Sequence, residues 1–326
     1  MPRRHLVQLA YNVTHLKDEN WHRDPKYKDW RASEKLDGHR ALWDGVSRGI
    51  PAHLIEWAAD NDPEDTCTGL FSRTGKIIHA PDSWLDQLPP GVPMDGELYL
   101  GRQSLQKTSS IVRTDVPDDL DWDKIRYCVF DIPDMSQILE EGEVYLRRHP
   151  TRGNVVLKLT HKALVTYMSN GGIVVDAPFE TRYQTLFHHY PSLCHYQELP
   201  PTLDTAEEIK AGGGEGLIIR DPEGLYVPWR TEQLLKIKPL MYAYAIVLAE
   251  IRGTNRNADR VGALEVLCNS LERTFNINVQ GDAAREWGTH PPNTKIEFSY
   301  RELSDNGIPL EPIYVRKLEN DWILGE

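Results

Sequence analysis

Short apolar runs, separated by Gly, Pro and Asp, recur along the chain from about residue 40 to residue 318. Such runs between turn residues are typical of β-strands. They predict strands over residues 40–45, 75–80, 95–101, 125–133, 215–222, 233–238, 244–251, 263–269, 294–303 and 313–318. Helical patterning predicts helices over residues 51–59, about 180–188 and 205–211, with Asp204 or Thr205 as the cap of the last.

The pattern changes near Pro239. Before this residue strands and helices are mixed, which indicates an α+β domain. After it we expect about five strands and little helix, the content of a small barrel of the OB type, a fold that binds oligonucleotides. The sequence therefore predicts one domain over residues 1–239 and an OB-fold domain over residues 240–326. Two polar stretches, about 46–69 and 135–175, are expected to be surface insertions.

Composition is that of an ordinary globular protein, since 40% of the 326 residues are hydrophobic and 26% are charged. No apolar run is long enough to cross a membrane and the N-terminal segment lacks a signal-peptide pattern, so we expect a cytoplasmic protein, most simply a monomer. The four cysteines lie too far apart for a zinc site. The net charge of −12 argues only weakly against a nucleic-acid partner, because DNA binding depends on a local basic surface.

One segment carries a candidate for covalent chemistry: SEKLDGHR, residues 33–40, contains the pattern KxDGxR with the lysine at position 35. Four fixed residue types at this spacing arise by chance in roughly one chain in 500 of this length. Alone, the segment is equally compatible with a strand end and a turn between exposed charges. A lysine that attacks a phosphate must be neutral, and an unperturbed amine, with a pKa of about 10.4, is neutral in roughly one molecule in 2,500 at pH 7. Nearby cations or a bound metal would favour the neutral form.

Five further motifs follow in order: FSRTG (71–75), DGELY (95–99), YCVFD (127–131), EGLIIR (215–220) and LLKIK (234–238). With them the chain resembles the covalent nucleotidyltransferase superfamily, and within it the small bacterial and phage ATP-dependent DNA ligases. The resemblance covers about residues 30–238 well and the remainder weakly. It implies an α+β nucleotidyltransferase domain, with ATP-grasp-like antiparallel sheets and helices, followed by a small OB-fold β-barrel.

The resemblance also implies roles for single residues. Lys35 would be the nucleophile, and Lys236 and Lys238 would stabilise charge on the transferred phosphoryl group and favour the neutral amine. Residues implied to contact the nucleotide phosphates are Arg40, Arg73, Arg220, Lys236 and Lys238. Residues implied to contact the adenosine are Glu34, Asp37, Glu97 and Phe130, the last by stacking on the adenine. Glu97 and Glu215 would hold Mg²⁺.

The nucleic-acid contacts are predicted from separate segments. By resemblance, Arg73 and Arg230 contact the 5′-phosphate of a nick. A basic loop of the C-terminal part contains Arg252, Arg256 and Arg260, and its arginines could either be solvated or contact DNA phosphates. After LLKIK the family often shows an acidic pair, whereas this chain has Tyr242 and Tyr244, so any contact of those carboxylates is lost.

Each motif also has an ordinary structural interpretation. FSRTG could be a hairpin turn with a solvated arginine, DGELY an exposed carboxylate before a strand, and EGLIIR a half-buried strand. YCVFD is expected to be a core strand in which Val129 is buried. The two lysines of LLKIK could line a solvated strand face, since side chains two residues apart share a face. The ordered series of six motifs favours the catalytic interpretation.

The resulting hypothesis is an enzyme that uses ATP and Mg²⁺ to seal nicked duplex DNA. Lys35 would attack ATP and retain AMP, pass it to the 5′-phosphate, and the 3′-hydroxyl would then displace AMP. One alternative is an RNA ligase or an mRNA-capping guanylyltransferase, which share the lysine chemistry. Another is a nucleic-acid-binding OB protein that carries an inactive transferase domain.

Overall fold

The computed structural model describes residues 6–13, 24–58, 62, 64–133, 143–147, 156–160, 178–255, 258–304 and 306–318, with the backbone alone for 143–147 and 156–160. The chain divides into two compact units, Met1–Ile237 and Lys238–Glu326. In the ranges that are described, no helix is long and apolar enough to cross a membrane.

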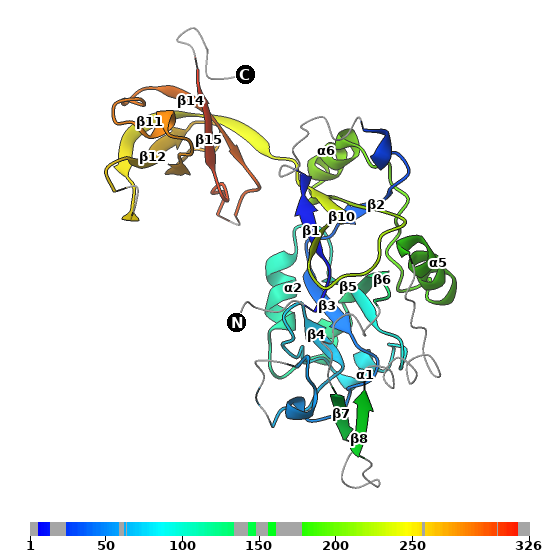
Figure 1. Ribbon diagram of the computed structural model, residues 1–326. Coiled ribbons are helices and arrows are strands. Elements are labelled where there is room, and N and C mark those ends of the chain that lie inside the picture. Colours follow the sequence, from blue (N-terminus) through cyan, green and yellow to red (C-terminus); the bar gives the residue numbers. More distant parts are fainter. Residues whose placement is uncertain are drawn as a thin grey trace. The chain divides into compact units, whose positions relative to one another are not determined.

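In its described part, the first unit contains a four-stranded sheet with the order β1-β10-β9-β2 (Figure 1). The strands are β1 (Leu9–Asn12), β2 (Arg31–Lys35), β9 (Gly216–Arg220) and β10 (Arg230–Ile237). β1 and β10 are parallel, and the other neighbours are antiparallel. Helix α6 (Leu203–Ala211) buries Ala206 and Ile209 against Ala32, Leu217 and Ile219 of one sheet face. The opposite face is therefore free to carry polar side chains.

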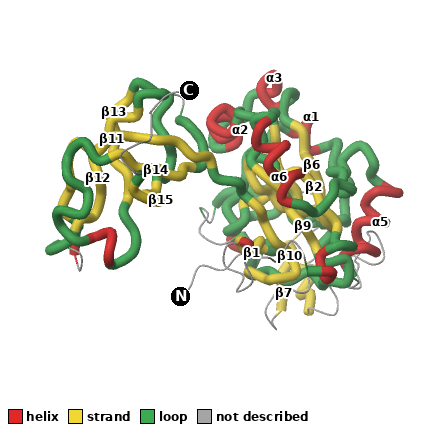
Figure 2. Tube along the Cα trace, turned by 90° about the horizontal axis from the view of Figure 1, so that it is seen from above, coloured by secondary structure: helices red, strands yellow, loops and turns green. Residues whose placement is uncertain are grey.

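A second four-stranded sheet in the described part of this unit has the order β4-β3-β5-β6. Its strands are β3 (His39–Trp43), β4 (Leu70–Ser72), β5 (Met94–Tyr99) and β6 (Arg126–Asp131). Three short helices contribute to the core on one face: α1 (Asp82–Leu85), α2 (Leu105–Val112) and α3 (Asp119–Trp122). Figure 2 shows the helices around the outside of the strands.

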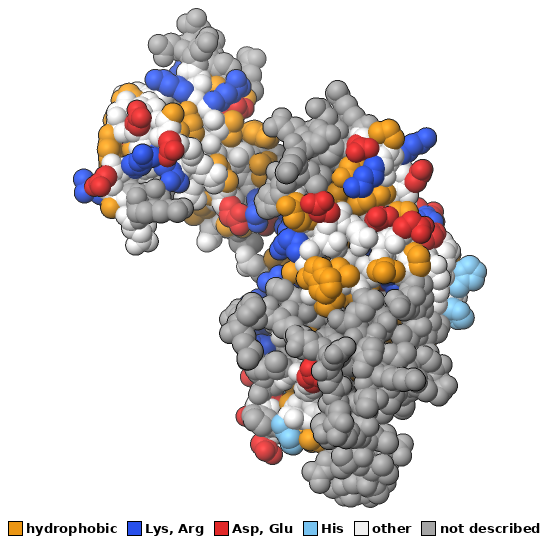
Figure 3. Space-filling model, in the orientation of Figure 1, with side chains coloured by type: hydrophobic (Ala, Val, Ile, Leu, Met, Phe, Trp, Pro, Cys, Tyr) orange, Lys and Arg blue, Asp and Glu red, His pale blue; other side chains and the backbone are white. Residues whose placement is uncertain are grey.

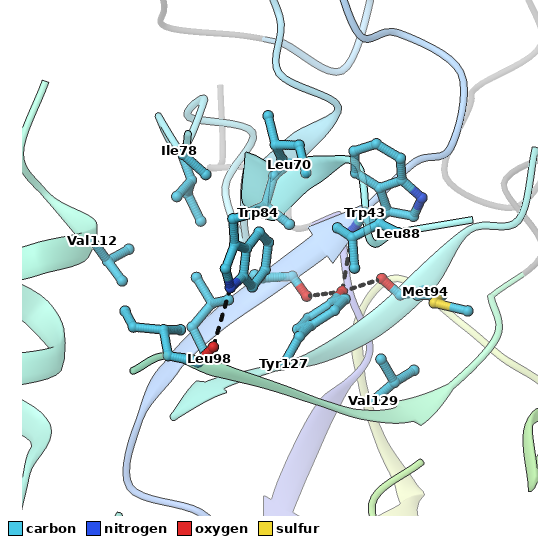
Figure 4. Packing of buried hydrophobic residues seen from close by; sticks show 14 of the residues in the cluster. Trp43, Leu70, Ile78, Trp84, Leu88, Met94, Leu98, Val112, Tyr127 and Val129 are labelled. Carbon is cyan, nitrogen blue, oxygen red and sulfur yellow. Dashed lines mark hydrogen bonds between the residues drawn. The ribbon is translucent and has the colours of Figure 1, made fainter. Parts of the chain in front are cut away.

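Aromatic residues fill this core (Figure 4), and the polar atoms of Trp43, Trp84 and Tyr127 are hydrogen-bonded, whereas the buried indole nitrogen of Trp122 has no partner among the described residues. The Tyr127 hydroxyl lies 2.6 Å from the carbonyl oxygen of Met94 and accepts the amide hydrogen of Trp43. The indole of Trp84 donates to the carbonyl of Ile125. These bonds connect strands β3, β5 and β6 on the side away from the polar face, so the core fixes the mutual register of the three strands.

The segment 46–69 is not the surface insertion that its polarity predicts. The carboxylate of Asp44 accepts bonds from two backbone amides that follow it and from the indole of Trp57, which fixes the turn into the segment. Trp57 and Cys67 are buried in a cluster with Phe71 of β4. The segment therefore supplies part of the core beside β3 and β4. Of the other predicted insertion, 135–175, the structure describes only a hairpin of β7 (Glu143–Arg147) and β8 (Val156–Thr160).

The second unit is a closed barrel with the strand order β11-β12-β13-β15-β14. Its strands are β11 (Met241–Arg252), β12 (Val261–Cys268), β13 (Arg273–Asn278), β14 (Lys295–Tyr300) and β15 (Ile313–Lys317). β13 and β15 are parallel, and every other neighbouring pair is antiparallel. Alternate side chains of β11 and β12, including Ala245, Val247, Leu264 and Val266, fill the interior.

The structure confirms the helix predicted over residues 180–188 as α5 (Phe179–His189) and that over 205–211 as α6, although Thr202 is the residue that caps α6. The helix predicted over 51–59 is wrong, because that segment forms only a 3₁₀ turn, Ala52–Leu54. The strand predicted over 75–80 is also wrong. Its residues follow the tight turn at Gly75 and make only an isolated bridge to β4, too little pairing for a strand.

Candidate active site

The KxDGxR segment carries the chain from one sheet of the first unit to the other. β2 ends at Lys35 and β3 begins at His39. At Gly38 the backbone lies so close to β5 that an added Cβ would stand 2.3 Å from the carbonyl oxygen of Leu98 and 2.8 Å from Cγ of Glu97. Only glycine fits without displacing β5. The motif's glycine is therefore a packing requirement, and it places Lys35 and Arg40 on the two sheets that border the site.

Strand register places a second lysine on the same sheet face as Lys35. Ser33 is opposite Ile218, and Ile218 is opposite Lys236, so these three side chains share a face. Lys35, two residues after Ser33, is on that face as well, opposite Gly216. Helix α6 packs on the other face. Lys238 follows the end of β10 and belongs to the second unit, so its contact with this site stays a prediction.

Polar side chains also line one face of the second sheet. Arg40 of β3 is opposite Glu97 of β5, and Glu97 is opposite Cys128 of β6. All three side chains therefore lie on the face opposite the aromatic core. The sequence predicted site roles for Arg40 and Glu97 but did not mark Cys128. Burial raises the pKa of the Cys128 thiol to about 11, so it is neutral at physiological pH.

The Lys35 amine forms an ion pair with the carboxylate of Glu215, 180 residues further along the chain. The Lys35 side chain is 23% exposed and that of Glu215 is 13% exposed, so the pair is partly shielded from water. Sequence reasoning expected cations beside the amine and assigned Glu215 to Mg²⁺. In the described structure the direct partner is instead an anion, which stabilises the charged ammonium.

Glu97 lies within electrostatic reach of this pair. Burial raises the pKa of Glu97 to about 7, with Lys35 and Arg40 opposing the shift and Glu215 and Asp95 adding to it. A carboxylate with this pKa is only partly ionised at neutral pH. The acidic neighbours Glu215 and Asp95 make the surroundings of Glu97 more negative. A bound cation would stabilise an ionised carboxylate in such surroundings.

Asp95 lies at the centre of a buried ionic network behind the site. The guanidinium of Arg40 donates two 2.6 Å bonds to the Asp95 carboxylate, and the Tyr226 hydroxyl donates a third at 2.7 Å. Asp131 similarly accepts from Arg182 at 2.7 Å and from Arg220 at 3.0 Å. Both aspartates are fully buried. Only charged partners of this kind make such burial tolerable. The sequence analysis missed this network, because its members come from distant segments with no shared pattern.

The network explains where Arg220 and Phe130 lie. Arg220 is 4% exposed, and burial, opposed by Asp131, lowers its pKa to about 10. This buried position does not support the phosphate contact implied for Arg220. The guanidinium groups of Arg40 and Arg220 lie 4.5 and 4.9 Å from the centre of the Phe130 ring. Stacking of Phe130 on adenine stays a prediction, and adenine would have to share the ring with these guanidinium groups.

Glu34 forms hydrogen bonds through both its side chain and its backbone carbonyl. Its carboxylate accepts two 2.8 Å bonds from Arg102, whose guanidinium also donates to the carbonyl of Gly212. The Glu34 side chain alternates with that of Lys35 and therefore lies on the α6 side of the sheet. Its backbone carbonyl lies 2.9 Å from Nε2 of His195. Sequence reasoning marked neither Arg102 nor His195. The contact of Glu34 with adenine stays a prediction, and with the side chain on the α6 side of the sheet it would come from the backbone.

The remaining predicted residues are at the surface or in turns. Asp37 is half-buried in the β2–β3 turn. Arg73 is exposed in the turn after β4, and Arg230 is exposed and donates to the carbonyl of Ala10 in β1. In the barrel, Arg252 and Arg260 are exposed, and Arg260 pairs with Asp282. Arg256 lies outside the described residues.

The basic side chains on the visible face of the barrel are mixed with other side chains (Figure 3). On the face of the second unit that is visible in Figure 3, Lys and Arg are interspersed with Asp, Glu and apolar side chains. The pairing of Arg260 with Asp282 and of Arg316 with Glu297 is consistent with this mixture. Any binding of nucleic-acid phosphates to this face would therefore use single arginines or lysines rather than a broad basic patch.

The donor set fits a loosely held Mg²⁺ rather than a preformed metal cage. Within the described ranges, no group of three or more His, Cys, Asp or Glu side chains could hold a metal ion. Mg²⁺ typically binds to one or two carboxylates together with substrate phosphates and water. Glu97 and Glu215 offer two carboxylates close enough to interact, since burial and the neighbouring Glu215 both raise the pKa of Glu97.

Comparisons with known proteins show what this chain is similar to in sequence and in fold. No protein-family model matches the sequence. The chain is 25% identical over 292 residues to a curated DNA ligase of Haemophilus influenzae, which covers 88% of this chain and 86% of that protein. A solved structure from a study of Lig E DNA ligases has a TM-score of 0.62 and 22% identity, and covers 96% of this chain and 98% of that one. Another, Pmar-Lig_PreS3, has a TM-score of 0.60 and 19% identity, and covers 95% of this chain and 67% of that one. At these identities the two structures show a shared fold.

Proposed function

We propose that this chain is an ATP-dependent DNA ligase and that it seals nicks with a 5′-phosphate and a 3′-hydroxyl in duplex DNA through AMP bound covalently to Lys35. The observation that carries the proposal is the environment of Lys35. Its amine forms an ion pair with Glu215. Lys236 lies on the same sheet face, and Glu97 is close enough to interact electrostatically with the Lys35 amine. The likeness to the Haemophilus influenzae DNA ligase supports the class of enzyme.

In the proposed first step the neutral Lys35 amine attacks the α-phosphorus of ATP. The N–P bond forms, the bond to the pyrophosphate oxygen breaks, and pyrophosphate leaves with its electron pair. The amine loses a proton as the N–P bond forms. In the second step a 5′-phosphate oxygen attacks the same phosphorus, the N–P bond breaks with its electron pair going to the Lys35 nitrogen, and this nitrogen takes up a proton from water. In the third step the 3′-hydroxyl attacks the 5′-phosphorus, AMP leaves and the backbone is joined. Lys236, and Lys238 if closure brings it near, would stabilise the negative charge that develops on the phosphoryl oxygens.

The two acidic residues have complementary proposed roles. Glu97 and Glu215 would hold Mg²⁺, which would neutralise charge on the phosphates. A cation held by Glu215 would compete with the Lys35 ammonium for that carboxylate. Arg40 is positioned by Asp95 and would contact the phosphates or the ribose from the opposite sheet.

The second unit is proposed to be an OB-fold domain that contacts the duplex. Support comes from its five strands, its closed strand order and the parallel β13–β15 pair, features that a Greek-key barrel of the OB type would have. Arg252 and Arg260 are candidates for phosphate contact from this barrel. We propose a monomer bound to one nicked duplex.

The first experiment is incubation of the purified protein with ATP labelled at the α-phosphate and with Mg²⁺, followed by a denaturing gel. We expect label on the wild-type protein and none on Lys35→Ala, because the substitution removes the proposed attacking amine. Lys107→Ala is the matched control, since Lys107 is an exposed lysine on α2. Full labelling of Lys35→Ala would disprove the nucleophile assignment.

A second experiment separates the substrate classes. A 5′-labelled nicked duplex of DNA is offered in parallel with a nicked RNA duplex, and ATP is compared with GTP. Joining of DNA with ATP is expected. Preferential use of GTP would favour a capping guanylyltransferase, and preferential joining of RNA would favour an RNA ligase. A protein that binds nicked DNA but never takes up label would be a nucleic-acid-binding protein with an inactive transferase domain.

A further inference from the structure

Strand β2, which ends in the proposed nucleophile, is at the edge of its sheet, so the outward carbonyls of β2 need partners other than a neighbouring strand. The segment 193–199 supplies them. The amide of Leu199 donates to the carbonyl of Ala32 at 3.0 Å, and Nε2 of His195 lies 2.9 Å from the carbonyl of Glu34. These two carbonyls are two residues apart and so point to the same side of β2.

The same segment is also attached to the other sheet. The amide of Val129 in β6 donates to the carbonyl of Leu193 at 2.8 Å, and the amide of His195 donates back to the carbonyl of Val129 at 2.6 Å. The side-chain amide of Gln197 donates to the carbonyl of Phe130 at 2.7 Å. Segment 193–199 therefore connects β6, which bears the predicted adenine-stacking ring, to the end of β2, which bears Lys35.

The contact of His195 with Glu34 has a defined direction. A carbonyl oxygen only accepts, so Nε2 of His195 must carry the hydrogen. Burial lowers the pKa of His195, against the bond to Glu34, so the ring is neutral at pH 7 with its proton on Nε2. The charged groups that act on it are Glu34, Arg220 and Arg126. At Ala32 the donor to the carbonyl is the backbone amide of Leu199. At Glu34 the donor from segment 193–199 is the imidazole ring of His195.

We propose that His195 is a positioning residue for Lys35: by holding the carbonyl of Glu34, it fixes the last peptide before the nucleophile and hence the direction from which the amine approaches phosphorus. This inference rests on the proposed function. Arg102 holds the side chain of the same residue through its carboxylate, so Glu34 is fixed at both its backbone carbonyl and its side chain. Misplacement of an attacking group by about 1 Å can lower a rate by about 100-fold.

The test uses three substitutions that differ in where they place a donor. His195→Gln places an amide nitrogen near the position of Nε2, His195→Asn places it near Nδ1, and His195→Phe keeps the ring shape without a donor. We expect labelling of Lys35 by ATP to be about 10- to 100-fold slower in the Asn and Phe variants and within about threefold of wild type in the Gln variant. The Michaelis constant for ATP should change much less than the rate. His189→Phe, an exposed histidine on α5, is the control.

A second measurement distinguishes positioning from a general structural role. A nick that already carries AMP on its 5′-phosphate needs no attack by Lys35, so sealing of this substrate should stay within about threefold of wild type in all three variants. Equal loss in labelling and in sealing, or no loss of labelling in His195→Phe, would overturn the inference. If His195→Phe does not fold, equal labelling of the Gln and Asn variants would overturn it. Absence of labelling in the wild-type protein would instead contradict the proposed function.

Discussion

At the residue scale, the pKa of Glu97 reflects its burial and the charged groups around it. Its pKa is raised from an ordinary 4.5 to about 7, so the folded protein binds this proton more tightly than the unfolded chain does. Folding stability therefore decreases as the pH rises from about 4.5 to about 7, and the full cost is present above pH 7. The same ionisation that destabilises the fold prepares the carboxylate to bind a cation.

The substitution Glu97→Gln tests both consequences. At pH 8 we expect the variant to be more stable than wild type by up to about 3 kcal/mol, because it removes the buried negative charge. At pH 4, where the wild-type carboxyl is protonated, the two proteins should unfold alike in urea. Labelling of the wild type should rise with pH through about 7, whereas labelling of Glu97→Gln should be low at every pH. A pH-independent difference in stability would contradict the assigned pKa.

Gly38 provides a residue-scale prediction about packing. An added Cβ would lie 2.3 Å from the Leu98 carbonyl oxygen, which is backbone and cannot move alone. We expect Gly38→Ala to lower the free energy of unfolding by about 1–3 kcal/mol and to slow labelling, since the β2–β3 turn must shift. Gly281→Ala is the comparison, because its Cβ meets nothing within 4 Å and only its φ of +85° is unfavourable. Equal effects of the two substitutions on labelling would disprove the packing explanation.

Single residues of the site divide into those that sequence could predict and those that it could not. The ordered motifs identified Lys35, Glu97 and Glu215, because the chemistry demands fixed residue types at short spacing. His195 and Arg102 act on the backbone or side chain of Glu34 from far along the chain, and no local pattern marks such a partner. A plain alternation argument could have shown that Glu34 and Lys35 point to opposite faces of β2.

At the element scale, long apolar strands were predictable, and short or polar elements were not. Strands such as β11 and β12 have enough alternation to be identified. β13, with the sequence RTFNIN, has too few apolar residues, although its Ile277 is fully buried in the barrel. The segment 46–69 was misread because its core contribution comes from single residues such as Trp57, fixed by Asp44 rather than by periodicity.

The loop that leads into β14 yields a prediction about the barrel. His290 is fully buried, and its ring nitrogens have no hydrogen-bond partner among the described residues. Its ring packs edge-on against Tyr314 and lies 3.9 Å from the carboxylate of Glu250. Burial lowers the pKa of His290, with Glu250 opposing and Lys317 adding to the shift. The unfolded chain therefore binds this proton more tightly, and stability is lost as the pH falls below about 6.5.

We expect His290→Phe to preserve the ring contact and to reduce this loss. Thermal unfolding of the wild type should shift to lower temperature between pH 8 and pH 5 by more than that of His290→Phe. His53→Phe is the control, because His53 is exposed in the first unit. The same pH dependence in wild type and His290→Phe would show that other groups cause the acid sensitivity.

At the scale of the whole molecule, the net charge of −12 must be reconciled with binding to DNA. The barrel face in Figure 3 carries cations among anions, so any duplex contact would use only a few of them. Acidic surroundings also limit attachment to DNA away from nicks, since non-specific affinity depends on how many phosphates are neutralised. Binding should therefore depend on salt less steeply than in proteins with large basic surfaces.

This reasoning gives a prediction for the exposed arginines of the barrel. Each phosphate contact contributes about 0.9 to the slope of log affinity against log salt concentration. Arg252→Ala should lower the slope for a nicked duplex by about that amount if Arg252 contacts a phosphate. Arg260→Ala should lower it less, because Arg260 already pairs with Asp282 and binding would exchange one anion for another. Fluorescence anisotropy at several salt concentrations, with Arg273→Ala as the control, measures these slopes. An unchanged slope in both variants would place the duplex on another surface of the chain.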